Sequence, residues 1–166
     1  MTRFSRAFAM PSSDTFTIPP IQDFLKRWHV APCCSVDPFA RNNTWASFSN
    51  DLNPATCASY HLDAEVFCRK IHEAGIRCDV GIFDPPYSPR QISECYQSIG
   101  RKVGTEETQN ARLYKRCRDA LHAIVKPQGI VLSFGWSSNG MGKGRGYEIE
   151  EILLVAHGGA HNDTIC

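Results

Sequence analysis

The sequence predicts an α/β fold with a mostly parallel, doubly wound sheet of about seven strands and an antiparallel last strand. Two observations predict it. Short apolar runs of strand length alternate along the chain with segments of helical period, which is the pattern of a sheet wound through crossover helices. A glycine-containing hairpin turn over residues 157–161 then separates the last two apolar runs, so the final strand is expected to reverse direction.

The composition is that of an ordinary globular domain. The chain has 166 residues, of which 42% are hydrophobic and 21% are charged, and its formal net charge is +1. A chain of this length forms one sizeable core. We expect a flexible N-terminal arm over residues 1–15 and a single domain over residues 16–166. The net charge gives no basic field of the kind that marks many nucleic-acid binders, although a local basic patch is compatible with it.

The cysteines predict a reducing compartment. No Cys-x-x-Cys pair is present, no signal peptide precedes them, and several lie inside apolar runs. We therefore expect reduced, mostly buried thiols in a cytoplasmic protein, without disulfides and without a zinc site. No apolar stretch reaches the roughly 18 residues that a membrane span needs. The eight cysteines are Cys33, Cys34, Cys57, Cys68, Cys78, Cys95, Cys117 and Cys166.

The elements follow from periodicity and from turn residues. Helices are expected over residues 22–28, 64–73, 89–99 and 109–125, with Asp63 and Ser88 before the second and third of them. Strands are expected over residues 33–37, 45–49, 78–83, 130–134 and 151–156, and from residue 162 onward. Polar turns are expected at residues 41–43, 101–110 and 126–129.

The strand over residues 78–83 ends on the segment Asp84-Pro85-Pro86-Tyr87. Two successive prolines cannot continue a ladder, because neither has an N–H and each fixes its own φ. The backbone must leave the sheet there, at the carboxyl end of a strand, where open α/β sheets bind ligands. A carboxylate and a proline carbonyl can accept the two N–H groups of a nucleobase amine, and an aromatic ring can stack on a base taken out of its helix. The alternative is a proline-stiffened turn with a capping aspartate.

Two further acids follow the same logic. Asp51 comes after the second expected strand, where an acid can hold the two hydroxyls of a ribose, or can equally cap a turn. Asp63 precedes the helix over residues 64–73, so it can cap that helix or accept from the exocyclic amine of an adenine.

These segments resemble, in order, the motifs of S-adenosylmethionine-dependent amino-methyltransferases, above all the adenine-N6 DNA methyltransferases. Residues 84–87 resemble the family's catalytic motif, and residues 37–40 (Asp-Pro-Phe-Ala) resemble the first half of its cofactor motif. Asp51 and the pair Asp63-Ala64 fall where the family binds ribose and adenine. The resemblance covers residues 33–166 and is strongest to short phage and prophage forms without a separate target-recognition domain.

The resemblance implies a Rossmann-like methyltransferase fold and methyl transfer from S-adenosylmethionine to adenine N6 in DNA, without a metal. It implies that Asp84 and the Pro85 carbonyl accept the target amine, that Pro86 completes the rigid segment, and that Tyr87 stacks on the base. The implied cofactor-binding residues are Asp37, Pro38, Phe39, Ala40, Asp51, Asp63 and Ala64, with Phe83 as an apolar wall.

The chain departs from the family at Arg41-Asn42-Asn43, where the family has Gly-x-Gly. Asparagine tolerates positive φ, so a tight turn is still expected, and Arg41 is placed to pair with the carboxylate of the cofactor.

Two other functions stay open. The same four catalytic residues occur among base methylases of ribosomal RNA, which makes an RNA amino-methyltransferase the first alternative. The second is a non-catalytic cofactor-binding or interaction protein. In the main interpretation the partners are DNA and, for sequence recognition, a further protein. The expected location is the cytoplasm of a bacterial host or of a phage-infected cell, with no membrane partner.

Overall fold

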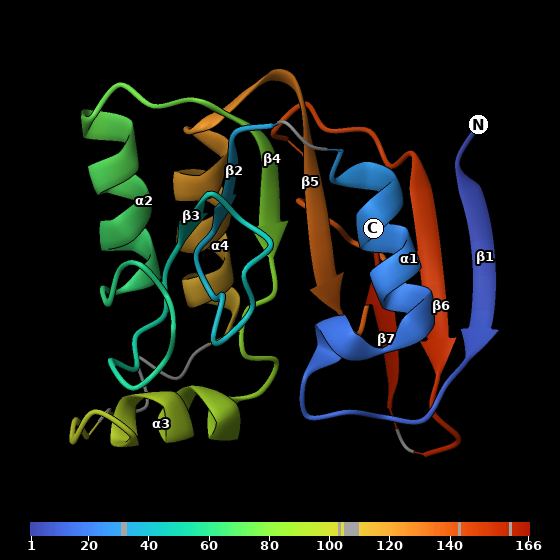
Figure 1. Ribbon diagram of the computed structural model, residues 1–166, viewed down its shortest axis with the longest axis horizontal. Coiled ribbons are helices and arrows are strands. Elements are labelled where there is room, and N and C mark those ends of the chain that lie inside the picture. Colours follow the sequence, from blue (N-terminus) through green and yellow to red (C-terminus); the bar gives the residue numbers. More distant parts are fainter. Residues whose placement is uncertain (31–32, 103, 105–109, 143, 160) are drawn as a thin grey trace.

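A computed structural model describes residues 1–30, 33–102, 104, 110–142, 144–159 and 161–166 (Figure 1). In this part of the chain the strands are β1 (Arg3–Phe8), β2 (Ser35–Asp37), β3 (Phe48–Ser49), β4 (Cys78–Phe83), β5 (Val125–Gly135), β6 (Glu151–Ala156) and β7 (Asn162–Ile165). The helices are α1 (Pro19–Trp28), α2 (Ala64–Glu73), α3 (Pro89–Gln97) and α4 (Asn110–His122), with a short 3-10 helix, η1, at Thr15–Thr17.

The strands form a seven-stranded sheet in the order β1-β6-β7-β5-β4-β2-β3. All neighbouring pairs are parallel except those made by β7, which runs antiparallel to both β5 and β6. This confirms the predicted α/β class and the reversed last strand, and it is consistent with a methyltransferase-type topology.

The sheet separates two apolar cores. α1 and η1 cover one face, where Phe24 and Leu25 pack on Ile82 and Leu132 of the central strands. α2 and α4 cover the other face. α4 approaches β4 closely because Gly81 has no side chain: a Cβ there would lie 3.2 Å from a Leu121 methyl. This contact holds α4 against the strand that carries Asp84.

Parallel strands bring their carboxyl ends to one edge of the sheet, called here the carboxyl edge. β2, β4, β5 and β6 all end there, and α3 lies at the same end of the molecule, beneath α2 and α4 in the view of Figure 1. The acids that the sequence places after β2, β3 and β4 therefore lie at one edge.

The expectation of a flexible arm over residues 1–15 is wrong for the first half of that segment. Residues 3–8 form β1, which pairs in parallel with β6 along its whole length. The Arg3 guanidinium also contacts the Glu151 carboxylate at 3.2 Å. The strand was missed because Phe4 and Phe8 point to solvent, so no alternation of apolar residues marks it. Backbone pairing with β6 holds it instead.

Several other boundaries differ from expectation. The helix predicted over residues 109–125 ends at His122, because Val125 already belongs to β5. The strand predicted over residues 45–49 is only Phe48–Ser49. The turn predicted at residues 126–129 lies inside β5, where an irregularity in the pairing with β4 and a positive φ of 67° at Gln128 accommodate it. Of the expected polar loop at 101–110, residues 103 and 105–109 lie outside the described residues.

Among the described residues, no helix has the length and apolar character to span a membrane.

Candidate functional site

The segment after β4 is held rigidly by side chains that follow it. The Gln91 side-chain oxygen accepts from the backbone N–H of Tyr87 (2.6 Å) and of Ser88 (3.1 Å). The Ser88 hydroxyl in turn accepts from the Gln91 N–H at 3.2 Å, which completes a capping box at the start of α3. Asp84 therefore lies between the end of a buried strand and a capped helix.

The two proline carbonyls differ in their environment. The Tyr114 hydroxyl, on α4, donates to the Pro86 carbonyl. No hydrogen bond to the Pro85 carbonyl is present within the ranges that the structure describes. The Pro85 carbonyl is therefore available as an acceptor, whereas the Pro86 carbonyl has a partner.

The Asp84 carboxylate accepts from the Tyr87 hydroxyl. Burial raises the pKa of Asp84 to about 6, against the lowering effect of that hydrogen bond. Burial also raises the pKa of Tyr87, followed by the charge of Asp84. Although its surroundings are desolvating, Asp84 still lines a cavity and can accept from a ligand there.

This cavity, called here the Asp84 cavity, has a volume of about 170 Å³. Its walls come from three parts of the chain: the segment before and within η1, the turn after β2, and Asp84 itself. The lining residues are Ser13, Asp14, Thr15, Phe16, Phe39, Ala40, Arg41, Asn42, Asn43 and Asp84. Both acids and an arginine thus face one space, a mixture that suits a zwitterionic ligand.

The turn after β2 keeps a tight shape without glycine. Arg41 adopts a positive φ of 51°, and its backbone N–H donates to Asp51 Oδ2 at 3.1 Å. Its guanidinium donates to the Ser13 carbonyl at 2.9 Å, which ties the N-terminal segment over the cavity. The residue in the left-handed region is thus Arg41 and not one of the asparagines that the sequence favoured.

Asp37 supports the turn after β2 and does not face the Asp84 cavity. Its side chain is fully buried and accepts from the Phe39 N–H (2.9 Å) and from Asn43 Nδ2 (3.1 Å). Burial raises the pKa of Asp37 to about 7, against the lowering effect of those hydrogen bonds. Asp37 does not line the cavity; it shapes the turn that carries Phe39 and Arg41.

A second cavity, the Asp63 cavity, lies beside Phe39, which lines both. Its volume is about 60 Å³. Asp51 and Asp63 contribute acidic groups, and the other walls are largely apolar. The lining residues are Pro38, Phe39, Asn50, Asp51, Leu52, Leu62, Asp63, Ala64, Pro86, Ile92, Cys95, Tyr96 and Leu113.

Both interpretations of Asp63 are compatible with its geometry, because its two oxygens have different partners. Oδ1 accepts from the Glu65 N–H at 3.0 Å and so caps α2, as the sequence predicted. Oδ2 accepts from the Tyr96 hydroxyl at 3.1 Å, on the cavity side. A ligand amine would therefore compete with or join the Tyr96 hydroxyl.

Asn50 joins the segments that carry the acids, and sequence reasoning missed it. Its amide donates to the carbonyls of Pro38 (3.0 Å) and Leu62 (2.9 Å), and its oxygen accepts from the Leu62 N–H at 3.0 Å. Its backbone N–H also donates to the Asp37 carbonyl at 2.9 Å. One fully buried amide thus fixes the spacing between the turn after β2 and the start of α2.

The structure therefore brings most of the predicted site residues together. Pro38, Phe39, Ala40, Asp51, Asp63, Ala64, Asp84 and Pro86 line the two cavities. Phe83 is buried beneath Phe39, with ring centroids 5.8 Å apart. Asp37, Pro85 and Tyr87 support the cavities without being among their lining residues.

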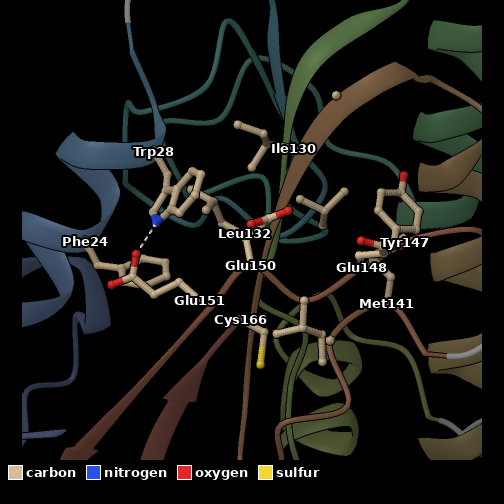
Figure 2. Close-up of a pocket in the computed structure, with 14 residues that line it drawn as sticks. Phe24, Trp28, Ile130, Leu132, Met141, Tyr147, Glu148, Glu150, Glu151 and Cys166 are labelled. Carbon is tan, nitrogen blue, oxygen red and sulfur yellow. Dashed lines mark hydrogen bonds between the residues drawn. The ribbon is translucent and has the colours of Figure 1, made fainter. Parts of the chain in front are cut away.

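A third cavity, of about 110 Å³, lies away from these residues and is shown in Figure 2. It lies between α1, the middle of β5 and the segment before β6, and none of the predicted site residues lines it. At one side the Trp28 indole N–H donates to Glu151 at 2.9 Å, the dashed line in Figure 2. Its position gives it no part in the site at the carboxyl edge.

In the described residues, no group of three or more His, Cys, Asp or Glu side chains gathers as in a metal site.

Comparisons with protein-family models, with curated proteins and with solved structures found no match to this chain.

Proposed function

We propose that this protein transfers a methyl group from S-adenosylmethionine to the N6 amine of adenine in DNA. The observation that carries the proposal is the pair of adjoining cavities at the carboxyl edge. Phe39 lines both, Asp63 faces one of them, and Asp84 faces the other. An adenosine-like group and a reacting amine each need an acidic acceptor, and the two cavities supply one each.

The residues of the Asp63 cavity suit the adenosine part of the cofactor. Asp51 can accept from the ribose hydroxyls, Asp63 can accept from the adenine amine, and Pro38, Leu52 and Ile92 offer apolar contact to the ring. The volume of about 60 Å³ is small for a nucleoside, so α3, which contributes Ile92, Cys95 and Tyr96, must shift outward on binding.

The Asp84 cavity suits the methionine part. The Arg41 guanidinium can exchange the Ser13 carbonyl for the cofactor carboxylate, and Asp14 can accept from its ammonium group. The bound cofactor supplies an electrophilic methyl group on a sulfonium centre.

The protein's part in the reaction is to hold the amine in line with that methyl group. Asp84 accepts one N–H of the amine, the Pro85 carbonyl accepts the other, and Tyr87 stacks on the base. The Tyr87 hydroxyl donates to Asp84, so the target amine must displace it. As the new C–N bond forms, the sulfur–methyl bond of the cofactor would break and S-adenosylhomocysteine would leave as a neutral thioether. The nitrogen loses one proton, which Asp84 is placed to receive.

The choice of adenine in DNA rests on the resemblance of residues 84–87 to adenine-N6 DNA methyltransferases. The chemistry of the site fits an exocyclic amine in either nucleic acid, so digestion of the product to nucleosides must name the base and the sugar. A partner protein that supplies sequence recognition is part of the proposal.

Cofactor binding tests the first half of this proposal. Calorimetry should detect binding of S-adenosylmethionine to the wild-type protein, and Asp51→Asn should weaken it by about tenfold or more, the contribution of one hydrogen bond to a charged group. Asp79→Asn is the matched control, because Asp79 is a half-exposed acid at the opposite end of β4, where it pairs with Lys126 and accepts from the Cys34 N–H. Absence of binding, or equal affinity in Asp51→Asn, would contradict the cofactor site.

A further inference from the structure

A row of aromatic rings continues outward from Asp84 along the carboxyl edge. The Tyr87 ring, whose hydroxyl donates to Asp84, lies 5.6 Å from the Trp136 ring, measured between centroids. Trp136 in turn stacks on His161 with centroids 4.5 Å apart and planes within 4° of parallel. Trp136 follows β5 and His161 precedes β7, so residues far apart in the sequence form this row.

Trp136 differs from the other two tryptophans. Trp28 donates its indole N–H to Glu151, and Trp45 packs against the edge of His29. The Trp136 side chain is 48% exposed, and its indole N–H has no hydrogen-bond partner in the part of the chain that the structure describes. A large aromatic surface is thus left in water directly beside the proposed base site, although burial would stabilise it.

We infer that the Trp136–His161 pair binds a nucleobase that flanks the target base on the same strand. The inference rests on the proposed function, because it takes Asp84 and Tyr87 as the site of the target base. Trp136 contacts the Tyr87 ring, whereas the Tyr87 hydroxyl contacts Asp84, so Trp136 is one ring further along the row. A base stacked there is the neighbour of the target and not the target itself. The ligand is recognised by its flat face, so every base is accepted, with stacking strength setting the preference.

The same geometry assigns single-stranded or locally opened nucleic acid to this surface. A base that stacks on the exposed ring surface of the Trp136–His161 pair must be unstacked from its neighbour, because that ring surface takes the place of the neighbouring base. The target base is also out of its stack in the proposed reaction. The two bases would then be held apart by the Tyr87 ring.

The test measures binding of a short single-stranded DNA with one adenine between two thymines. A second oligonucleotide has abasic positions in place of both thymines. Binding is followed by fluorescence anisotropy without cofactor, so the result does not depend on methyl transfer. Trp136→Ala should weaken binding of the first oligonucleotide by about 5-fold to about 150-fold, which corresponds to ~1–3 kcal/mol of stacking. It should change binding of the abasic oligonucleotide by less than about twofold.

Two further variants separate stacking from damage to the fold. Trp136→Phe keeps a ring and should retain most of the affinity, while losing the quenching of tryptophan fluorescence that a stacked base causes. Phe4→Ala is the matched control, because Phe4 is an exposed aromatic residue on β1, 66% exposed and outside the row. It should bind both oligonucleotides like the wild type.

Equal affinity of wild type and Trp136→Ala for the first oligonucleotide would overturn the inference, and so would equal losses for both oligonucleotides. Either result leaves methyl transfer through Asp84 standing. Conversely, Trp136-dependent binding without any methyl transfer would reject the proposed function and leave the base-binding surface in place.

Discussion

Asp84 lies in surroundings that set its charge as well as its position. Burial raises the pKa of Asp84 to about 6, and the Tyr87 hydroxyl opposes this rise because it donates to the ionised form. An acceptor for an amine must be ionised, so the proposed chemistry depends on this balance. Asp84 is therefore mostly ionised at pH 7 and begins to take up a proton only slightly below that pH.

The pH profile of methyl transfer should report this balance. We expect kcat/KM to fall below pH of about 6, since its acidic limb follows the free enzyme. Tyr87→Phe removes the donor that favours the ionised form, so it should move the limb to higher pH. Tyr96→Phe removes the hydroxyl that donates to Asp63 and not to Asp84, so it should leave the acidic limb at the same pH. A limb at the same pH in Tyr87→Phe and wild type would contradict the assignment.

Asp37 predicts a pH dependence of stability of the opposite kind from a salt-bridged acid. Its pKa is about 7 in the folded protein and about 3.9 in an unfolded chain, so the folded state binds more protons between these values. The free energy of unfolding should therefore fall as pH rises from about 4 to about 7, by up to about 1.4 kcal/mol per pH unit from this group.

Urea unfolding of Asp37→Asn at several pH values checks this prediction. In this variant Asn43 Nδ2 would face a second amide, which lowers the free energy of unfolding by the same amount at every pH. The variant lacks the carboxyl group that titrates. The difference in stability between wild type and variant should shrink from pH 4 to pH 7 in favour of the variant. Parallel curves would show that Asp37 does not titrate in this range.

At the scale of elements, the start of α3 fixes the segment that carries Asp84. The Gln91 side chain holds the N–H groups of Tyr87 and Ser88 at once. Gln91→Ala should destabilise the protein by about 1–2 kcal/mol, the usual cost of a lost helix cap. Gln97→Ala is the control, since that side chain bonds only Ser93 among the described contacts of the same helix. Chemical denaturation that gives equal stabilities for the two variants would contradict this role.

The elements that sequence reasoning predicted well are those with local caps and buried faces. The bounds of α2 match because Asp63 caps it and its apolar residues repeat at helical spacing. β4 and β6 match because they are short apolar runs. β1 was missed because its stability comes from pairing with a strand about 150 residues away in sequence, which no local pattern records.

In the candidate site, too, sequence reasoning missed the contacts between residues that are far apart in the sequence. Asp51, Asp63 and Asp84 were found because acids after strands mark the carboxyl edge. Tyr96 and Tyr114 were missed because their acceptors, Asp63 and the Pro86 carbonyl, lie 33 and 28 residues away. Asparagine and tyrosine are common on surfaces, so only the fold shows which of them face a site.

At the scale of the whole molecule, one buried carboxylate joins three elements far from the site. Glu151, at the start of β6, contacts Arg3 on β1 at 3.2 Å and Arg27 on α1 at 2.8 Å, and accepts from the Trp28 indole at 2.9 Å. It therefore connects the edge strand and the helix to the sheet.

Glu151→Ala should destabilise the protein by roughly 1–3 kcal/mol, because the Trp28 N–H loses its acceptor while the half-exposed arginines regain water. Glu151→Gln should have a smaller effect, since its oxygen can still accept from Trp28. Thermal unfolding followed by circular dichroism measures both. Equal melting temperatures for wild type and Glu151→Ala would show that these contacts contribute nothing net.

The central claim is that the carboxyl edge methylates a nucleobase amine through Asp84. The most direct measurement is transfer of a labelled methyl group from S-adenosylmethionine to unmethylated duplex DNA, followed by digestion to nucleosides. We predict label in N6-methyladenine with the wild-type protein and a rate lower by about 100-fold or more with Asp84→Asn, which cannot accept as an anion. No label from a wild-type protein that binds the cofactor, or equal label from Asp84→Asn, would contradict the account.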